Sequence, residues 1–150
     1  APAYLDGPHG NLTLSGREGE GIAFIAGGVG LAPIMSVLRQ LRAEGDRRPL
    51  VLLYGNRIAD QILFSDELDA MSGDMNLTLH HVLSEPAPDW DGTVGQLEQN
   101  VLDKLLPADR RDKWLYFVCG PGPMIDSVEA SLGELGIPIR QIVSEKFSYD

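Results

Sequence analysis

The chain has 150 residues, of which 22 are acidic and 12 basic, for a formal net charge of −10, and 43% of the residues are hydrophobic. These values fit one globular domain with a sizeable core, and the acidic balance argues against binding nucleic acid or an anionic membrane surface by charge. A single cysteine, Cys119, excludes an internal disulfide, so a reducing compartment is the expected setting.

The chain opens irregularly and then settles into an alternation of strand-like and helix-like segments. Residues 6–10 look like a turn and residues 11–14 like a short strand. The apolar run at residues 22–26 ends in glycines and predicts the first strand of the alternation. Apolar residues at helical spacing follow, and Gly45 is a good stop for that helix. They are Ile34, Val37, Leu38 and Leu41.

Two more strand–helix units follow in the middle of the chain. Residues 50–54 and 77–83 predict the second and third strands. Each is followed by apolar residues at helical spacing, first Phe64, Leu68 and Met71, then Leu97, Val101, Leu102 and Leu105. Ser65 is a plausible N-cap of the first of these helices, and Pro107 closes the second.

The last third of the chain predicts one further helix between two strands. The strands are expected at residues 114–119 and 141–144. Gly136 and Pro138 stop the helix between them. Its apolar face is formed by Ile125, Val128, Leu132 and Leu135.

Strands that alternate with helices imply crossover connections and a parallel sheet covered by helices on both faces. We therefore predict an α/β, Rossmann-like fold with five parallel strands in the order 3-2-1-4-5, an order taken partly from analogy with known folds. Ligands of such sheets bind at the carboxyl ends of the strands, where the strand order reverses. That places any site near Gly27 and Cys119.

The strongest local signal is the segment at residues 26–33, Ala-Gly-Gly-Val-Gly-Leu-Ala-Pro. It follows a strand and opens a helix, whose free N–H groups and partial positive charge suit a pyrophosphate. We expect a side chain at Gly30 to block that ligand without unfolding the domain. The alternative is a tight turn without a ligand, since a lone glycine motif is weak. The candidate residues are Gly27, Gly28, Gly30, Leu31 and Pro33.

The second signal is the segment at residues 119–124, Cys-Gly-Pro-Gly-Pro-Met, at the end of the fourth strand. Its prolines and glycines predict a rigid loop that can wall a flat ring such as nicotinamide. The alternative for Cys119 is a buried small hydrophobic residue, the commoner fate of a lone cysteine. The candidate residues are Cys119, Gly120, Pro121, Gly122 and Met124.

The third signal is the segment at residues 54–57, Tyr-Gly-Asn-Arg, at the end of the second strand. Dinucleotide folds read the adenosine ribose here, where an acid holds a free 2′-OH and an arginine accommodates a 2′-phosphate. Arg57 favours the phosphate and Asp60 opposes it, so NADH and NADPH both stay open. The candidates are Asn56 and Arg57, and a solvated loop arginine is the alternative.

Other features of the sequence point away from membranes and metals. No apolar run approaches the roughly 20 residues of a membrane-spanning helix, and the first ten residues do not resemble a signal peptide. No metal-ligand spacing is present, and the adjacent His80 and His81 would point to opposite faces of a strand.

Taken together, the segments closely resemble the nucleotide-binding domain of the ferredoxin–NADP reductase superfamily, in order and over nearly the whole chain. By this resemblance, residues 27–33 form the pyrophosphate loop and residues 119–124 lie beside the nicotinamide. Residues 145–147, Glu-Lys-Phe, resemble the acidic-x-aromatic ending of that family. The resemblance implies catalytic positions for Cys119, Glu145 and Phe147, with Phe147 near the flavin ring.

The resemblance also implies how the chain is organised and what it does. Residues 1–19 resemble the tail end of a flavin-binding barrel, and residues 20–150 an NAD(P)-binding domain. We expect an oxidoreductase domain that presents the nicotinamide of NADH or NADPH to FAD on a neighbouring domain of the same polypeptide. Electrons would then pass to a haem, iron–sulfur or ferric acceptor, as in ferric-reductase, NADPH-oxidase or oxygenase-reductase members.

On this interpretation the chain is a piece of a longer reductase and is inactive alone. It would be cytoplasmic, or the cytoplasmic domain of a membrane reductase. The alternative function is a non-catalytic nucleotide-binding regulatory module.

Overall fold

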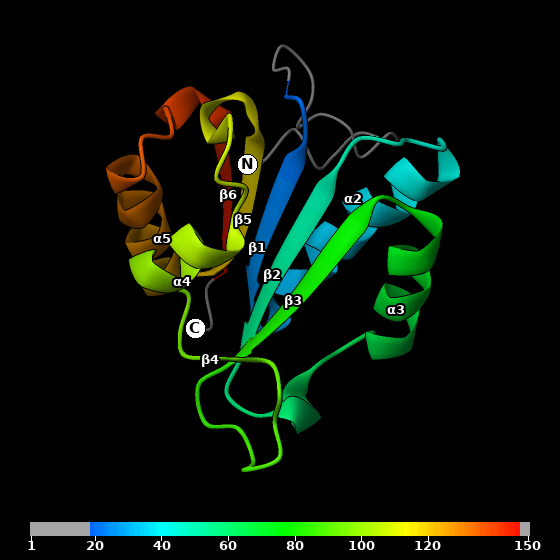
Figure 1. Cartoon of the computed structure of the whole chain (residues 1–150), viewed down its shortest axis with the longest axis vertical. Helices are drawn as coiled ribbons and strands as arrows, with labels where there is room; N and C mark the ends of the chain where they lie inside the picture. Colours follow the sequence, from blue (N-terminus) through cyan, green and yellow to red (C-terminus); the bar gives the residue numbers. More distant parts are fainter. Residues whose placement is uncertain (1–18, 148–150) are drawn as a thin grey trace.

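The computed structural model describes residues 19–147, which form a parallel sheet between two pairs of helices (Figure 1). The strands are β1 (Ile22–Gly27), β2 (Leu50–Asn56), β3 (Leu77–Leu83), β4 (Thr93–Val94), β5 (Leu115–Pro121) and β6 (Ile142–Phe147). The helices are α2 (Leu31–Ala43), α3 (Ser65–Asp74), α4 (Gln99–Leu105) and α5 (Gly122–Glu134).

The strand order is β4-β3-β2-β1-β5-β6, and all neighbouring strands run parallel. The five predicted strands therefore lie in the predicted relative order, and the Rossmann-like α/β fold is confirmed. The predicted number of strands is wrong, because β4 adds a sixth strand at the edge. It has only two residues, which pair with Val82 and Leu83, so no apolar run marks it in the sequence.

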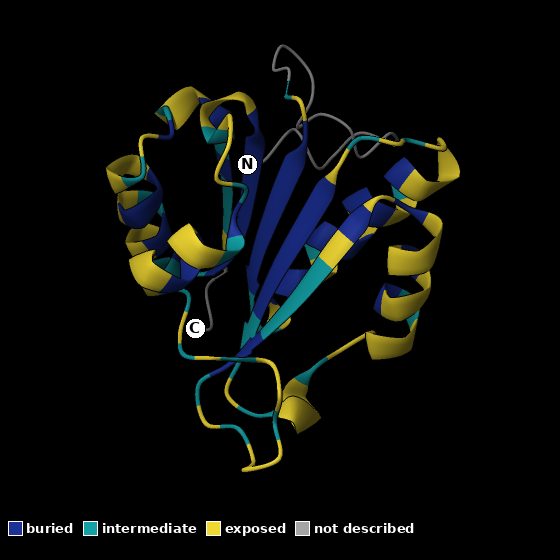
Figure 2. Ribbon diagram, viewed as in Figure 1, coloured by how far each residue is buried: buried dark blue, intermediate teal, exposed yellow. Residues whose placement is uncertain are grey.

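The core lies on both faces of the sheet, as predicted. Phe24 packs into the cluster beneath α2 and α3, whereas its neighbour Ile25 packs into the cluster beneath α4 and α5. Strand β1 is buried except at its carboxyl end, which is why its sequence is a continuous apolar run rather than an alternation. Figure 2 shows the same burial along the central strands.

The starts of two helices differ from the prediction. Ser65 is not the N-cap of α3: Phe64 takes that position in the left-handed conformation, at φ 56° and ψ 31°. The N–H of Leu63 donates to the Tyr54 hydroxyl at 3.0 Å, so a contact with β2 sets where α3 begins. Leu97 precedes α4 instead of lying within it.

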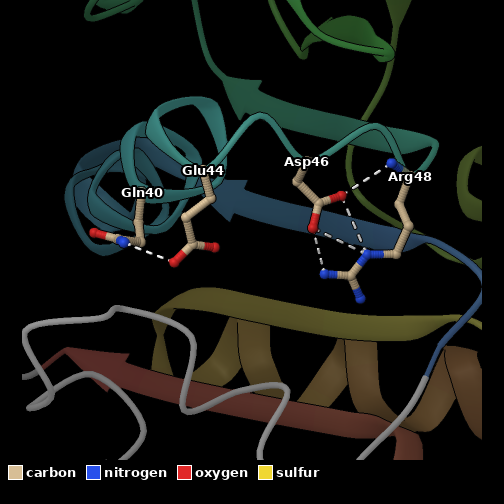
Figure 3. Close-up of polar contacts among 4 residues, drawn as sticks. All are labelled: Gln40, Glu44, Asp46 and Arg48. Carbon is tan, nitrogen blue, oxygen red and sulfur yellow. Dashed lines mark hydrogen bonds and ion pairs between the residues drawn. The ribbon is translucent and has the colours of Figure 1, made fainter.

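The connection from α2 to β2 is held at the amino edge of the sheet by charged side chains (Figure 3). Arg48 donates through its backbone N–H to Asp46 Oδ1 at 2.9 Å and through Nη2 to Asp46 Oδ2 at 2.6 Å. These hydrogen bonds hold the pKa of Asp46 below its usual range. The loop is therefore ordered at the edge of the sheet away from the carboxyl ends of the strands.

Some predictions cannot be compared with the structure. The turn at residues 6–10, the strand at residues 11–14 and the end of the chain at residues 148–150 lie outside the described residues. Within residues 19–147, each helix is too short or too polar to cross a membrane.

Candidate functional site

A cavity of about 480 Å³ opens at the carboxyl ends of the strands. It lies where the strand order reverses. The chain passes from β1 to β2 on one side of β1, and later returns to β5 on the other side of β1. Sheets of this kind bind ligands at that position. Five of the predicted residues line the cavity, from all three predicted segments: Gly27, Gly28, Asn56, Pro121 and Met124.

The glycine segment forms a 3₁₀ turn at Gly28–Gly30 that leads directly into α2. Gly28 has a φ of +55°, and a Cβ built there would have open space on all sides within 4 Å. Its backbone is therefore bare towards the cavity. A ligand can approach it more closely than it could any residue with a side chain.

The start of α2 supplies the electrostatics of this turn. Within the described residues, no side chain caps α2, and its first turn carries no acidic residue. The backbone N–H groups and partial positive charge of a 13-residue helix are thus directed at the turn, which favours an anion there. Leu31 is fully buried and Pro33 half-buried, and neither lines the cavity, so both serve to shape the helix start.

Gly30 has a different role from Gly28. A Cβ at Gly30 would lie 2.3 Å from the carbonyl oxygen of Cys119 and 2.7 Å from its carbonyl carbon. Both are main-chain atoms of the adjacent strand β5, which cannot turn aside as a flexible side chain can. The expectation that a side chain at Gly30 would leave the fold intact is therefore wrong, and Gly30 is required for packing.

The opposite wall is formed by residues of the segment 119–124, which is not the predicted loop, because β5 runs to Pro121 and α5 begins at Gly122. Pro121 and Met124 line it, together with Pro123 and Ser127. The sulfur of Met124 lies over the ends of both central strands, because a Cβ at either Gly27 or Gly120 would come within 2.4 Å of it. Gly120 and Gly122 belong to this segment without lining the cavity.

Cys119 is fully buried in the core beneath α2. Burial, together with the neighbouring Glu145 carboxylate, raises the pKa of its thiol. The thiol is therefore protonated and inert as a nucleophile at neutral pH. Glu145 is paired in register with Cys119, and Phe147 with the cavity-lining Pro121, so β6 brings the predicted acidic-x-aromatic segment next to β5.

The burial of Cys119 gives a direct prediction. Ellman's reagent should label the native protein on the order of 100-fold more slowly than the urea-unfolded protein, because the reagent needs an accessible thiolate. The rates are read from the absorbance of the released thiol product. Equal rates in the folded and unfolded protein would show that Cys119 is accessible after all.

The connection from β3 to α4 supplies a side of the cavity that the sequence did not indicate. Gly95, Gln96, Leu97 and Glu98 line it, with Val82 and Ser84 at the end of β3. Leu97 lies over Gly55, where a Cβ would come within 3.0 Å of its Cδ1 atom. The sequence could have indicated this segment by its position alone, because it also follows the carboxyl end of a parallel strand, where ligands of such sheets bind.

Polar groups at the β2–β3 end of the cavity complete the site. The buried Nδ2 of Asn56 has no hydrogen-bond partner among residues 19–147, which makes it a donor available to a ligand. Arg57 lies outside the lining and is exposed, and its Nη1 is 3.4 Å from Glu85 Oε1. Within residues 19–147, no group of three or more His, Cys, Asp or Glu side chains could hold a metal ion.

Comparisons with known proteins identify the family of the chain. Residues 24–130 match the family described as the oxidoreductase NAD-binding domain. NADH-cytochrome b5 reductase 1 of Laccaria bicolor is 32% identical over 144 residues, which are 94% of this chain and 47% of the relative. The chain thus spans about half the length of this curated relative.

Solved structures show the same fold. The cytochrome b5 reductase domain of Ulva prolifera nitrate reductase superposes with a TM-score of 0.77 at 25% identity, covering 86% of this chain and 49% of that one. The Amycolatopsis cytochrome P450 reductase GcoB superposes with a TM-score of 0.74 at 25% identity, covering 88% of this chain and 38% of that one.

Proposed function

Because this chain belongs to the oxidoreductase NAD-binding domain family, we propose that it is the nucleotide-binding part of an NADH-dependent flavin reductase. It would bind NADH across the carboxyl edge of its sheet and present the nicotinamide to FAD held by another domain of the same protein. The observation that carries the proposal is the cavity at the reversal of strand order, with a bare glycine turn and a helix N-terminus on one side. The curated relatives named as NADH-cytochrome b5 reductases support NADH as the coenzyme.

The residues present fit a dinucleotide. The pyrophosphate would lie against Gly28 and the start of α2, where the backbone is bare and the helix end is positive. The amide of Asn56 offers a hydrogen-bond donor, and the hydroxyl of Ser84 can donate to or accept from ribose. Pro121 and Met124 provide an apolar wall for a flat ring.

Reduced nicotinamide supplies the hydride, and the contribution of this chain is to bind and orient it. Pro121 ends β5 and Met124 lies in the first turn of α5, so both side chains are held by regular elements and restrict where a ring can lie. By the family resemblance, Glu145 and Phe147 would lie at the reacting end. In keeping with this, β6 pairs with β5 beside that segment. Cys119 would act there through its main chain and packing, since its thiol is buried and protonated.

The onward electron acceptor is proposed from the relatives. Their names indicate a haem protein of the cytochrome b5 type, so we propose a haem acceptor. The described residues hold no group that could accept the hydride themselves, because the single cysteine is a free thiol and cannot form an internal disulfide that hydride would reduce.

Titration of the chain with NADH by calorimetry tests the proposal. We expect saturable one-to-one binding with a Kd within the range of about 1 μM to 1 mM that is common for enzyme substrates. AMP should compete with NADH if the adenosine half uses the β2–β3 end of the cavity. A folded chain that releases no binding heat and shows no NADH fluorescence change would contradict the proposed function.

A further inference from the structure

The main chain holds Arg57 and Glu85 side by side at the mouth of the cavity. The paired register of β2 and β3 ends at Asn56 and Leu83, but the hydrogen bonding continues. The N–H of Ser84 donates to the carbonyl of Asn56 at 3.1 Å, and the N–H of Glu85 to the carbonyl of Arg57 at 2.9 Å. The closeness of the two charged residues is therefore set by the backbone, and it does not depend on two long side chains finding each other.

The two side chains form an ion pair that faces solvent. Arg57 Nη1 lies 3.4 Å from Glu85 Oε1, and the side chains are 54% and 64% exposed. An exposed pair contributes only about 0.2–1 kcal/mol to folding. Its removal should therefore leave the fold intact, and its larger effect is on which other anions can reach the guanidinium.

The pair stands where the adenosine ribose of a dinucleotide is read. Arg57 directly follows Asn56 and Glu85 directly follows Ser84, and both preceding residues line the cavity. An arginine at the end of the second strand accommodates a 2′-phosphate, whereas an acid favours a free 2′-OH. In this chain the arginine is present but already faces a carboxylate.

The remaining charge of the site does not help a phosphate at this end. Of the side chains that line the cavity within residues 19–147, Glu98 is the one that carries charge, and it is acidic. A 2′-phosphate at this end would therefore meet an arginine that already faces a carboxylate, and the cavity lining within residues 19–147 supplies no cation to compensate.

We propose that Glu85 is a specificity-determining residue, which keeps Arg57 occupied and thereby makes the site prefer NADH over NADPH. Arg57 could then bind a 2′-phosphate only when it is released from Glu85, which lies 28 positions further along the chain. The inference rests on the proposed function, because it concerns the same nucleotide site.

The test compares the Kd values of NADH and NADPH, measured by calorimetry for four proteins. Glu85→Gln removes the carboxylate charge while keeping the shape, and should lower the ratio of the NADPH Kd to the NADH Kd about two- to fivefold, the change that corresponds to the strength of an exposed ion pair. Asp60→Asn is the matched control, because it removes one exposed acidic charge three residues from Arg57 without touching the Arg57–Glu85 pair, and it should leave the ratio unchanged. In the double variant Arg57→Ala, Glu85→Gln the gain should disappear, since the contact it frees is absent.

Each outcome bears on the inference in a defined way. An unchanged ratio in Glu85→Gln would overturn it, as would an equal change in Asp60→Asn. A full gain that persists in the double variant would show that Glu85 acts by repulsion alone and would overturn the role of Arg57. If the folded wild-type chain bound neither coenzyme, the proposed function would fail and this inference with it. If the chain bound NADH but Glu85→Gln left the ratio of the two Kd values unchanged, only the inference would fail.

Discussion

Replacing Gly28 with asparagine should weaken NADH binding by about 10- to 100-fold while leaving the domain folded. A charge-assisted hydrogen bond contributes roughly 1.5–3 kcal/mol, and the loss of the pyrophosphate contact accounts for a change of that size. The new side chain would have room in the absence of ligand, because a Cβ at Gly28 meets nothing within 4 Å. It would extend into the space that the pyrophosphate needs.

Asparagine is the substitution of choice because Gly28 has a φ of +55°, a conformation that asparagine tolerates better than other residues with side chains. Gly45→Asn is the matched control. Gly45 has a φ of +69° and equally open surroundings, but it follows the end of α2 away from the cavity. Calorimetric Kd values and thermal midpoints for both variants check the prediction. If both variants lost NADH affinity to the same degree, the effect would come from backbone strain and not from the ligand site.

Replacing Gly30 with alanine should instead destabilise the fold, lowering the free energy of unfolding by about 3 kcal/mol or more. The added Cβ would lie 2.3 Å from the Cys119 carbonyl oxygen and 3.0 Å from the Gly120 Cα. Forcing atoms into a well-packed core commonly costs about 1–3 kcal/mol, and more where the neighbour cannot move. Here the neighbour is the backbone of a central strand, which pairs with β1 on one side and β6 on the other.

Urea unfolding followed by circular dichroism measures this loss. Gly73→Ala serves as the comparison, because Gly73 lies in α3 with open space around it. That change should stabilise the protein by about 0.5–1 kcal/mol, the usual gain of alanine over glycine in a helix. A Gly30→Ala protein as stable as the wild type would mean that the β1–α2 turn and β5 are less closely packed than the structure shows.

Much of the fold could be predicted from the sequence because the spacing of apolar residues within a short segment indicates whether it forms a strand or a helix. Continuous apolar runs mark strands buried on both faces, and they identified β1, β2 and β5 from composition alone. The glycine segment at residues 27–33 was recognisable because a strand, a bare turn and a helix start follow one another directly in the chain. The same local segments carried the family resemblance, which the match over residues 24–130 confirms.

The tertiary structure alone decided the features that depend on residues far apart in the chain. Phe64 takes the N-cap position of α3 next to Leu63, whose N–H is hydrogen-bonded to Tyr54 in β2. Gly30 is a packing residue because Cys119 lies against it, and no local pattern reports a neighbour 89 positions away.

The acidic partner of Arg57 shows the same limit at the candidate site. The sequence offered Asp60, three residues away, as the acid that opposes a 2′-phosphate, whereas in the structure the carboxylate beside Arg57 is that of Glu85, which follows the end of β3. The sequence by itself determined five of the six strands and the four helices of residues 19–147, with their order, and it singled out the segments that are proposed to bind the nucleotide. The crossover connections, which bring the ends of distant strands to one edge, decided which residues face one another there and what each can do.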